Sequence, residues 1–204
     1  MSSELSKPLK YLITISQFAS VIPILIGISK WNRSQTIMRL VIAILAAWLA
    51  AEIIQFITRS NSIHNLWISY ALTPIQLILM GFYFKLLMPE RRILIIVLFG
   101  TGLMLAAIET IVRPLTHLNS ISLLYQCFII VLIGMLAFYG MISKGNFVFV
   151  WSCAAFIILF MGSAVYYAAF IKLDNMDLLR MLSAGHTYLL ILTYSLITVE
   201  VWKQ

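Results

Sequence analysis

Three side chains that can exchange protons lie inside long apolar runs of this sequence. Glu52 and Glu109 each lie about one helical turn from the end of such a run, and His186 lies deeper in the last run. A charged side chain at the centre of a membrane helix costs ~2.5–3.5 kcal/mol on insertion scales, so each needs a structural or chemical reason to be there. Carboxylates and an imidazole are groups that general acid–base catalysis uses.

Glu109 has a structural explanation within its own helix, whereas Glu52 has none of that kind. Arg113 follows Glu109 at i+4, the spacing at which a carboxylate and a guanidinium pair on one helix face. The face of Glu52 instead holds Trp48 and Gln55, so a partner must come from another helix. We therefore expect Glu52 to belong to a site. For Glu109, a site role and a structural ion pair are equal alternatives.

The larger polar side chains gather in one half of the apolar runs. The half that contains both glutamates holds most of the glutamines and tyrosines and the histidine, whereas the other half holds mainly small hydroxyls and a few aromatics. Several lie deeper than an interfacial belt of aromatic residues would. The pattern predicts a polar basin that opens on one side of the membrane. Its predicted ligand-contacting residues are Glu52, Gln55, Tyr70, Gln76, Glu109, Gln126, Tyr166 and His186.

The composition indicates which elements must position these residues. The chain has 204 residues, of which 62% are hydrophobic and 10% are charged, whereas soluble chains are about 45–50% apolar and about 25% charged. A soluble globular domain is therefore excluded. The net charge of +7 does not indicate binding of nucleic acid, because the basic residues stand singly at the ends of apolar runs, where they meet lipid headgroups.

Seven apolar runs are long enough to cross a bilayer core of about 30 Å as helices. The connections between them are short, which makes consecutive helices antiparallel neighbours. We predict an all-α fold, a polytopic bundle of seven transmembrane helices that forms a single transmembrane domain over residues 1–204. A faint internal repeat is compatible with one helix plus three helical hairpins. The predicted helices cover residues 11–29, 37–57, 66–87, 93–112, 121–143, 147–171 and 178–201.

The Lys and Arg residues predict an orientation for this bundle. Of the 14 basic residues, eight lie on the side of the C-terminus and six on the other side. Because the side richer in Lys and Arg faces the cytoplasm, we predict a cytoplasmic C-terminus and an N-terminus outside. The polar basin then opens outward.

Short motifs along the chain suggest a resemblance to known membrane proteins. Ala51-Glu52 ends the second predicted helix, Asn65-Leu66-Trp67 and Tyr70 open the third, and His186 lies in the seventh. With these residues the chain resembles small seven-helix bacterial integral membrane proteins of unassigned function. The resemblance spans most of the chain and implies a seven-helix bundle in the bacterial cytoplasmic membrane. It implies no activity.

The sequence lacks the motifs of several membrane and enzyme chemistries. No lysine lies between Leu178 and Trp202, so a retinal Schiff base of the usual seven-helix kind has no place to form. HExxH, GxSxG and Walker sequences are absent. The two cysteines, Cys127 and Cys153, lie inside apolar runs and are interpreted as small buried residues. We predict neither a cofactor nor a bound metal.

Three functions from different classes remain open. The first is a receptor or sensor that binds a small or lipid-like ligand in the polar basin and signals through a cytoplasmic or membrane partner protein. The second is an intramembrane enzyme that acts on a lipid or lipid-linked substrate, with Glu52, Glu109 and His186 as acid–base groups. The third is a small proton-coupled carrier, for which polar groups should continue to the inner face. The expected surroundings in each case are membrane lipids, without nucleic acid.

Overall fold

The computed structural model describes residues 11, 15–16, 18–32, 34–61, 66–112, 118–172 and 176–203. Within these residues the secondary structure is helical, without a strand, which confirms the all-α prediction. The elements in chain order are α2 (Val21–Ser29), α3 (Thr36–Ser60), α4 (Trp67–Leu87), the short 3-10 helix η1 (Pro89–Arg91), α5 (Arg92–Val112), α6 (Ser120–Ser143), α7 (Val150–Lys172) and α8 (Met176–Lys203).

Six of these helices, α3 to α8, are long and apolar enough to cross a membrane. Their bounds agree with the predicted ranges to within three residues. Two ends differ by three residues, since α3 continues to residue 60 instead of 57 and α7 begins at residue 150 instead of 147. Before α7, Gly145 and Phe149 adopt positive φ angles of 64° and 68°, which delays the start of the helix. The predicted first span over 11–29 lies partly outside the described residues, and α2 has nine residues. A seventh span therefore stays a prediction.

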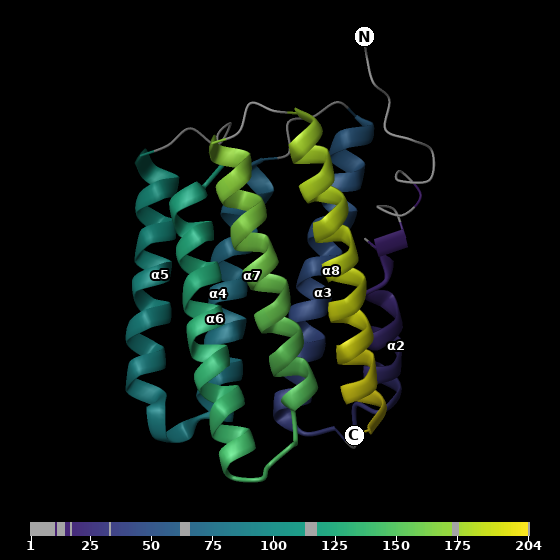
Figure 1. Ribbon diagram of the computed structural model, residues 1–204, viewed down its shortest axis with the longest axis vertical. Coiled ribbons are helices and arrows are strands. Elements are labelled where there is room, and N and C mark those ends of the chain that lie inside the picture. The colour runs from purple at the N-terminus through teal and green to yellow at the C-terminus, as the bar shows by residue number, and fades with distance from the viewer. Residues whose placement is uncertain are drawn as a thin grey trace.

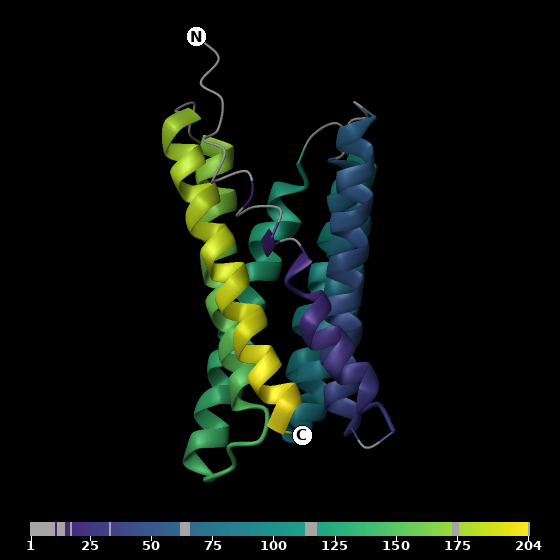
Figure 2. The same ribbon diagram turned by 90° about the vertical axis from the view of Figure 1, so that its right-hand side faces the viewer.

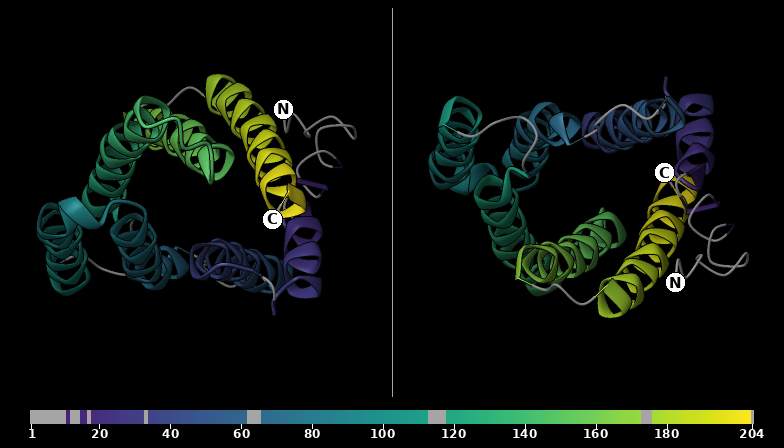
Figure 3. Two further views of the ribbon diagram at one scale, coloured as in Figure 1. Left: turned by 90° about the horizontal axis from the view of Figure 1, so that it is seen from below. Right: turned by 90° about the horizontal axis from the view of Figure 1, so that it is seen from above.

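The helices form two rows (Figures 1 and 3). One row contains α3, α4 and α5, the other contains α6, α7 and α8, and α6 packs against both α4 and α5. α2 stands between α3 and α8 and contacts both. We call the end at which α3, α5 and α7 finish the wide end, because α3 and α8 diverge toward it (Figure 2). The opposite end, where α2 lies between them, is the narrow end.

Large apolar side chains fill the half of the bundle toward the narrow end. Tyr83 lies at their centre, with its ring 5.1 Å from that of Phe84 and 5.3 Å from that of Phe156, both edge to face. At the α2 contact, a Cβ on Gly27 would overlap the side chain of Ile42, so a larger residue there would require that side chain to move. The largest fully buried side chains are Tyr83, Phe84, Phe156, Met38, Ile44, Leu45, Leu77, Met80, Ile95, Ile129, Ile130 and Ile133.

Two buried glutamates hold the first turns of neighbouring helices. Glu109 on α5 accepts hydrogen bonds from the backbone N–H of Ile121 (3.2 Å) and of Ser122 (2.8 Å) at the start of α6. Glu200 on α8 accepts three from the start of α7, including the N–H of Trp151 at 3.0 Å. The first N–H groups of a helix have no partner within the helix, and its positive end favours a carboxylate. Both glutamates therefore join adjacent helices.

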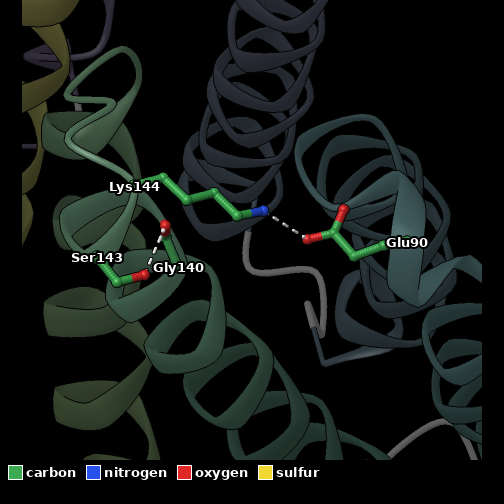
Figure 4. Close-up of polar contacts among 4 residues, drawn as sticks. All are labelled: Glu90, Gly140, Ser143 and Lys144. Atoms are coloured by element: carbon green, nitrogen blue, oxygen red, sulfur yellow. Dashed lines mark hydrogen bonds and ion pairs between the residues drawn. The ribbon is translucent and has the colours of Figure 1, made fainter.

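Polar contacts also connect the segments at the narrow end. Lys144, which follows α6, pairs with Glu90 of η1 at 3.2 Å (Figure 4), and both side chains are exposed. Lys30, at the end of α2, donates to the backbone carbonyl of Trp202 at 2.6 Å. This second contact ties α2 to the last turn of α8.

Candidate functional site

Two adjoining cavities lie in the wide half of the bundle, between α3, α4, α6, α7 and α8. The deeper one, here the inner cavity, has a volume of about 130 Å³. The outer cavity lies nearer the wide end and has a volume of about 420 Å³. Because they share part of their lining, a ligand in one can extend into the other. The residues that line both are Glu52, Gln55, Leu123, Tyr167, His186 and Leu190.

α3 and α8 each contribute one continuous face to these cavities. On α3 the lining residues Trp48, Glu52 and Gln55 follow each other at i, i+4 and i+7, which places them on one side of a helix. On α8, His186 and Tyr194 are eight residues apart and share a face in the same way. Since α3 and α8 belong to different rows (Figure 3), the site requires both rows.

Aromatic rings form the base of the inner cavity. The ring of Trp48 lies 6.0 Å from that of Phe156, 6.1 Å from that of Phe160 and 6.5 Å from that of Tyr194. Trp48 is 6% exposed, and its indole N–H finds no hydrogen-bond acceptor among the described residues. Buried polar groups are nearly always paired with protein, ordered water or ligand. Among the described residues this donor is therefore left unsatisfied beside the inner cavity.

Two glutamines join α4 and α6 beside the inner cavity. The side-chain amide of Gln126 donates to the amide oxygen of Gln76 at 2.7 Å, and both residues line the cavity. The bond uses one donor of Gln126 and the oxygen of Gln76, and a primary amide carries two donors and one acceptor oxygen. Each side chain thus keeps groups that can bind a ligand.

His186 is held by contacts from α7. Its Nε2 lies 3.0 Å from the hydroxyl of Ser163, and its ring stacks on that of Tyr166 at 5.3 Å with an interplanar angle of 27°. Tyr166 in turn packs edge to face on Tyr167 at 5.7 Å. These contacts fix the imidazole at the boundary between the two cavities, where it can donate or accept a proton.

The structure brings six of the eight predicted site residues to the cavities. They are Glu52, Gln55, Gln76, Gln126, Tyr166 and His186. Tyr70 is buried on α4 and Glu109 caps α6, and neither lines either cavity. Arg113, the alternative partner of Glu109, lies outside the described residues. A role in ligand binding stays a prediction for all eight.

Several lining residues were missed by the sequence analysis. Trp48, Phe160, Ser163, Tyr167 and Tyr194 all line the inner cavity. The helical spacing of Trp48 from Glu52, and of Tyr194 from His186, was a usable signal. The missed residues of α7, Phe160, Ser163 and Tyr167, had no such helical spacing to indicate them, because an apolar helix shows no preferred face in its sequence. Among the described residues, no three His, Cys, Asp or Glu side chains come together as metal ligands.

The fold is an α-helical bundle, and its composition and helix lengths are those of a polytopic integral membrane protein. No protein-family model, curated protein or solved structure matches the chain. The predicted resemblance to small bacterial seven-helix proteins therefore stays a prediction, and function is argued from the cavities alone.

Proposed function

We propose that this protein is a receptor-like membrane protein that binds a small or lipid-like ligand in the two adjoining cavities. The observation that carries the proposal is a hollow lined by polar groups from five helices inside an otherwise apolar bundle. Ligand sites characteristically combine an apolar lining with a few converging polar groups. Glu52 and His186 are the proposed ligand contacts that line both cavities, and Gln76 and Gln126 lie at the inner one.

The same geometry supports transmission of a signal across the bundle. A ligand that touches Glu52 on α3 and His186 on α8 favours one separation of these helices, and α2 packs between their narrow ends. There Gly27 lies against Ile42 of α3 and Val201 of α8. A change in separation must therefore repack α2 at the end that carries Lys30, Lys144 and Lys203. In the proposed orientation that end is cytoplasmic, in a bacterial cytoplasmic membrane, where a partner protein can read it.

Thermal unfolding of the purified full chain tests for the site. Lipids, headgroup fragments and metal salts are screened against the wild type, Glu52→Gln and Glu90→Gln, which removes an exposed carboxylate at the opposite end. A ligand at ~100 times its Kd stabilises the folded state by ~2.7 kcal/mol. We expect at least one compound to raise the Tm of the wild type and of Glu90→Gln but not of Glu52→Gln. If none does so, the cavities are not a ligand site.

A distance measurement tests the receptor aspect separately. Spin labels at the exposed positions Phe56 on α3 and Tyr188 on α8 report the separation of the two helices near the wide end. We expect the compound found by thermal unfolding to shift or narrow the distance distribution. An unchanged distribution with bound compound would indicate a binding site without a conformational response.

A second candidate is an intramembrane enzyme, favoured by the shared position of Glu52 and His186 at both cavities. A carboxylate and an imidazole on one hollow can act as general base and general acid. Glu109 is not required, because it caps α6. Mass spectrometry of lipids incubated with the wild type and with His186→Ala would show turnover that depends on the imidazole.

The third alternative, a proton-coupled carrier, finds less support in the arrangement of the helices. A carrier needs polar groups on both sides of its central site. The narrow half is instead filled by apolar side chains such as Leu45, Met80 and Ile133, all fully buried.

A further inference from the structure

We propose that the ligand carries a methylated ammonium group, which the inner cavity binds between aromatic rings and the carboxylate of Glu52. This inference rests on the proposed function and names the class of ligand for the same cavities. Four features of the lining support it: the aromatic rings, the sign of the charge, the size of the space and the unsatisfied donor of Trp48.

The aromatic rings come from three of the five helices around the inner cavity. Trp48, Phe160, Tyr167 and Tyr194 all line it, on α3, α7 and α8. The face of an aromatic ring attracts a cation, most strongly for Trp, and cages of such rings are a recurrent way to bind methylated ammonium groups. An aliphatic ligand would need none of these rings in particular.

The charge of the lining favours a cation over an anion. Among the described residues that line the two cavities, Glu52 is the one acidic residue, and none is Lys or Arg. An anionic ligand would meet this carboxylate in a medium of low dielectric constant, where repulsion between like charges is strong. A cation gains the corresponding attraction.

The size of the inner cavity limits which ammonium group fits. A volume of about 130 Å³ is close to that of an engineered ~150 Å³ protein cavity that binds benzene. A trimethylammonium group is of similar bulk, whereas a tetrabutyl cation is much too large. The outer cavity, with about 420 Å³, then holds the remainder of the ligand. That remainder can be a short free molecule or the glycerophosphate part of a lipid.

The indole N–H of Trp48 adds a requirement for an oxygen close to the cationic group. Trp48 lines the inner cavity, and the N–H has no acceptor among the described residues. Because the indole nitrogen itself is buried, the N–H has to turn toward the cavity to reach a ligand. A hydroxyl, carboxylate or phosphate oxygen three bonds from the ammonium nitrogen would then accept its hydrogen bond. Choline, betaine and a phosphocholine headgroup share this chemistry.

The test compares choline with 3,3-dimethylbutan-1-ol, an uncharged molecule of the same shape in which carbon replaces the nitrogen. Binding to the wild-type full chain is measured by calorimetry in a maltoside detergent, which has no ammonium group. We expect choline to bind at least tenfold more tightly than its carbon analogue. This comparison needs no variant, so it does not depend on whether a substitution folds.

Variants then show which side chains contribute to the binding of choline. Glu52→Gln should weaken choline at least tenfold, and Trp48→Phe should weaken it three- to tenfold, because phenylalanine keeps an aromatic face and loses the N–H. Glu90→Gln, at the narrow end, should bind like the wild type. Equal binding of choline by Glu52→Gln, with the Tm of the free protein unchanged, would overturn the role of this carboxylate.

The source of the ammonium group is distinguished by the surrounding bilayer. In nanodiscs of phosphatidylcholine, occupancy by the lipid headgroup should abolish choline binding, whereas nanodiscs of phosphatidylglycerol should leave it intact. Unchanged choline binding in both would indicate a free ligand. Either result supports an ammonium site.

Failure of this inference is distinguishable from failure of the proposed function. If the carbon analogue binds as tightly as choline, the ammonium inference is wrong and the cavity remains a ligand site. The same holds if neither binds while another class of compound raises the Tm in a manner that depends on Glu52. If no compound of any class binds, both proposals fall.

Discussion

The two halves of this bundle are built from the same helices yet are filled in different ways. In the narrow half, side chains such as Leu45, Tyr83 and Phe156 are fully buried, and the rings of Tyr83 and Phe156 pack edge to face. In the wide half, α3 and α8 diverge (Figure 2), and the space between the rows contains the two cavities. The hollow therefore follows from the divergence of α3 and α8, which α2 joins at the narrow end only.

Polar side chains serve different purposes in the two halves. Glu200, at the narrow end, accepts hydrogen bonds from backbone N–H groups at the start of α7, so its carboxylate stabilises the fold. Glu52, in the wide half, lines cavity space. Glu109 lies near the wide end but resembles Glu200, because it caps α6. Position along the membrane normal alone therefore does not identify a site residue.

The largest expected effect on stability comes from replacing Glu52, Glu109 and Glu200, one at a time, by glutamine. At Glu109 and Glu200 one carboxylate oxygen becomes an NH₂ group that faces backbone donors, so buried N–H groups lose their acceptor, at a cost of about 3 kcal/mol each. At Glu52, which lines cavity space, we expect a smaller loss of stability. Unfolding in mixed micelles with an increasing fraction of denaturing detergent would measure the free energy of unfolding of each variant. Equal destabilisation by all three substitutions would contradict the assigned difference between capping and lining glutamates.

Truncation of leucine compares the packing of the two halves directly. Leu45→Ala, in the narrow half, removes atoms from a fully buried side chain and should cost about 2 kcal/mol, the lower end of the range for such substitutions. Leu123→Ala borders both cavities, so fewer contacts are lost and the cost should be less than half as large. The same unfolding assay applies. A larger loss for Leu123→Ala would show that the wide half is packed as tightly.

Removal of one hydroxyl in each half should produce a smaller difference. Tyr83→Phe breaks a buried contact of 3.1 Å with Ser152 and should destabilise by about 0.6 kcal/mol, the mean for such bonds within membranes. Ser163→Ala removes the partner of His186, but the imidazole borders cavity space that water can occupy, so we expect a smaller loss. A greater loss for Ser163→Ala would indicate that the cavities are dry.

The smallest effect is expected at the exposed ion pair of the narrow end. Lys144 and Glu90 are 3.2 Å apart, with 68% and 53% of their side chains exposed. Exposed pairs of this kind contribute little because water screens them and ordering the side chains costs entropy. Glu90→Gln should leave the unfolding midpoint within error of the wild type. A measurable loss of stability would show that the two narrow-end connections depend on this contact.

The sequence was sufficient to predict the six long helices and the half of the membrane that contains the site. The length of each apolar run determines which residues span the membrane. Six of the eight predicted site residues lie at the cavities, because the number of a residue fixes its depth along its helix. It was insufficient for Glu109 and Glu200, whose partners belong to neighbouring helices. The same limit applies to Phe160 and Ser163 on α7, since an apolar helix shows no preferred face in its sequence. Only the packing of the two rows reveals this.

The native cysteines allow the most direct test of the central claim, that the wide half holds an accessible cavity and the narrow half does not. Both cysteines are buried in the apolar core, but Cys127 also lines the inner cavity, whereas Cys153 lines neither cavity. The purified wild-type protein is treated with methyl methanethiosulfonate, a small uncharged thiol reagent, and the modified cysteine is identified by peptide mass. We expect Cys127 to be modified well before Cys153, and a bound ligand to protect Cys127. Equal rates of modification of the two cysteines, or modification of Cys153 first, would contradict an accessible cavity confined to the wide half.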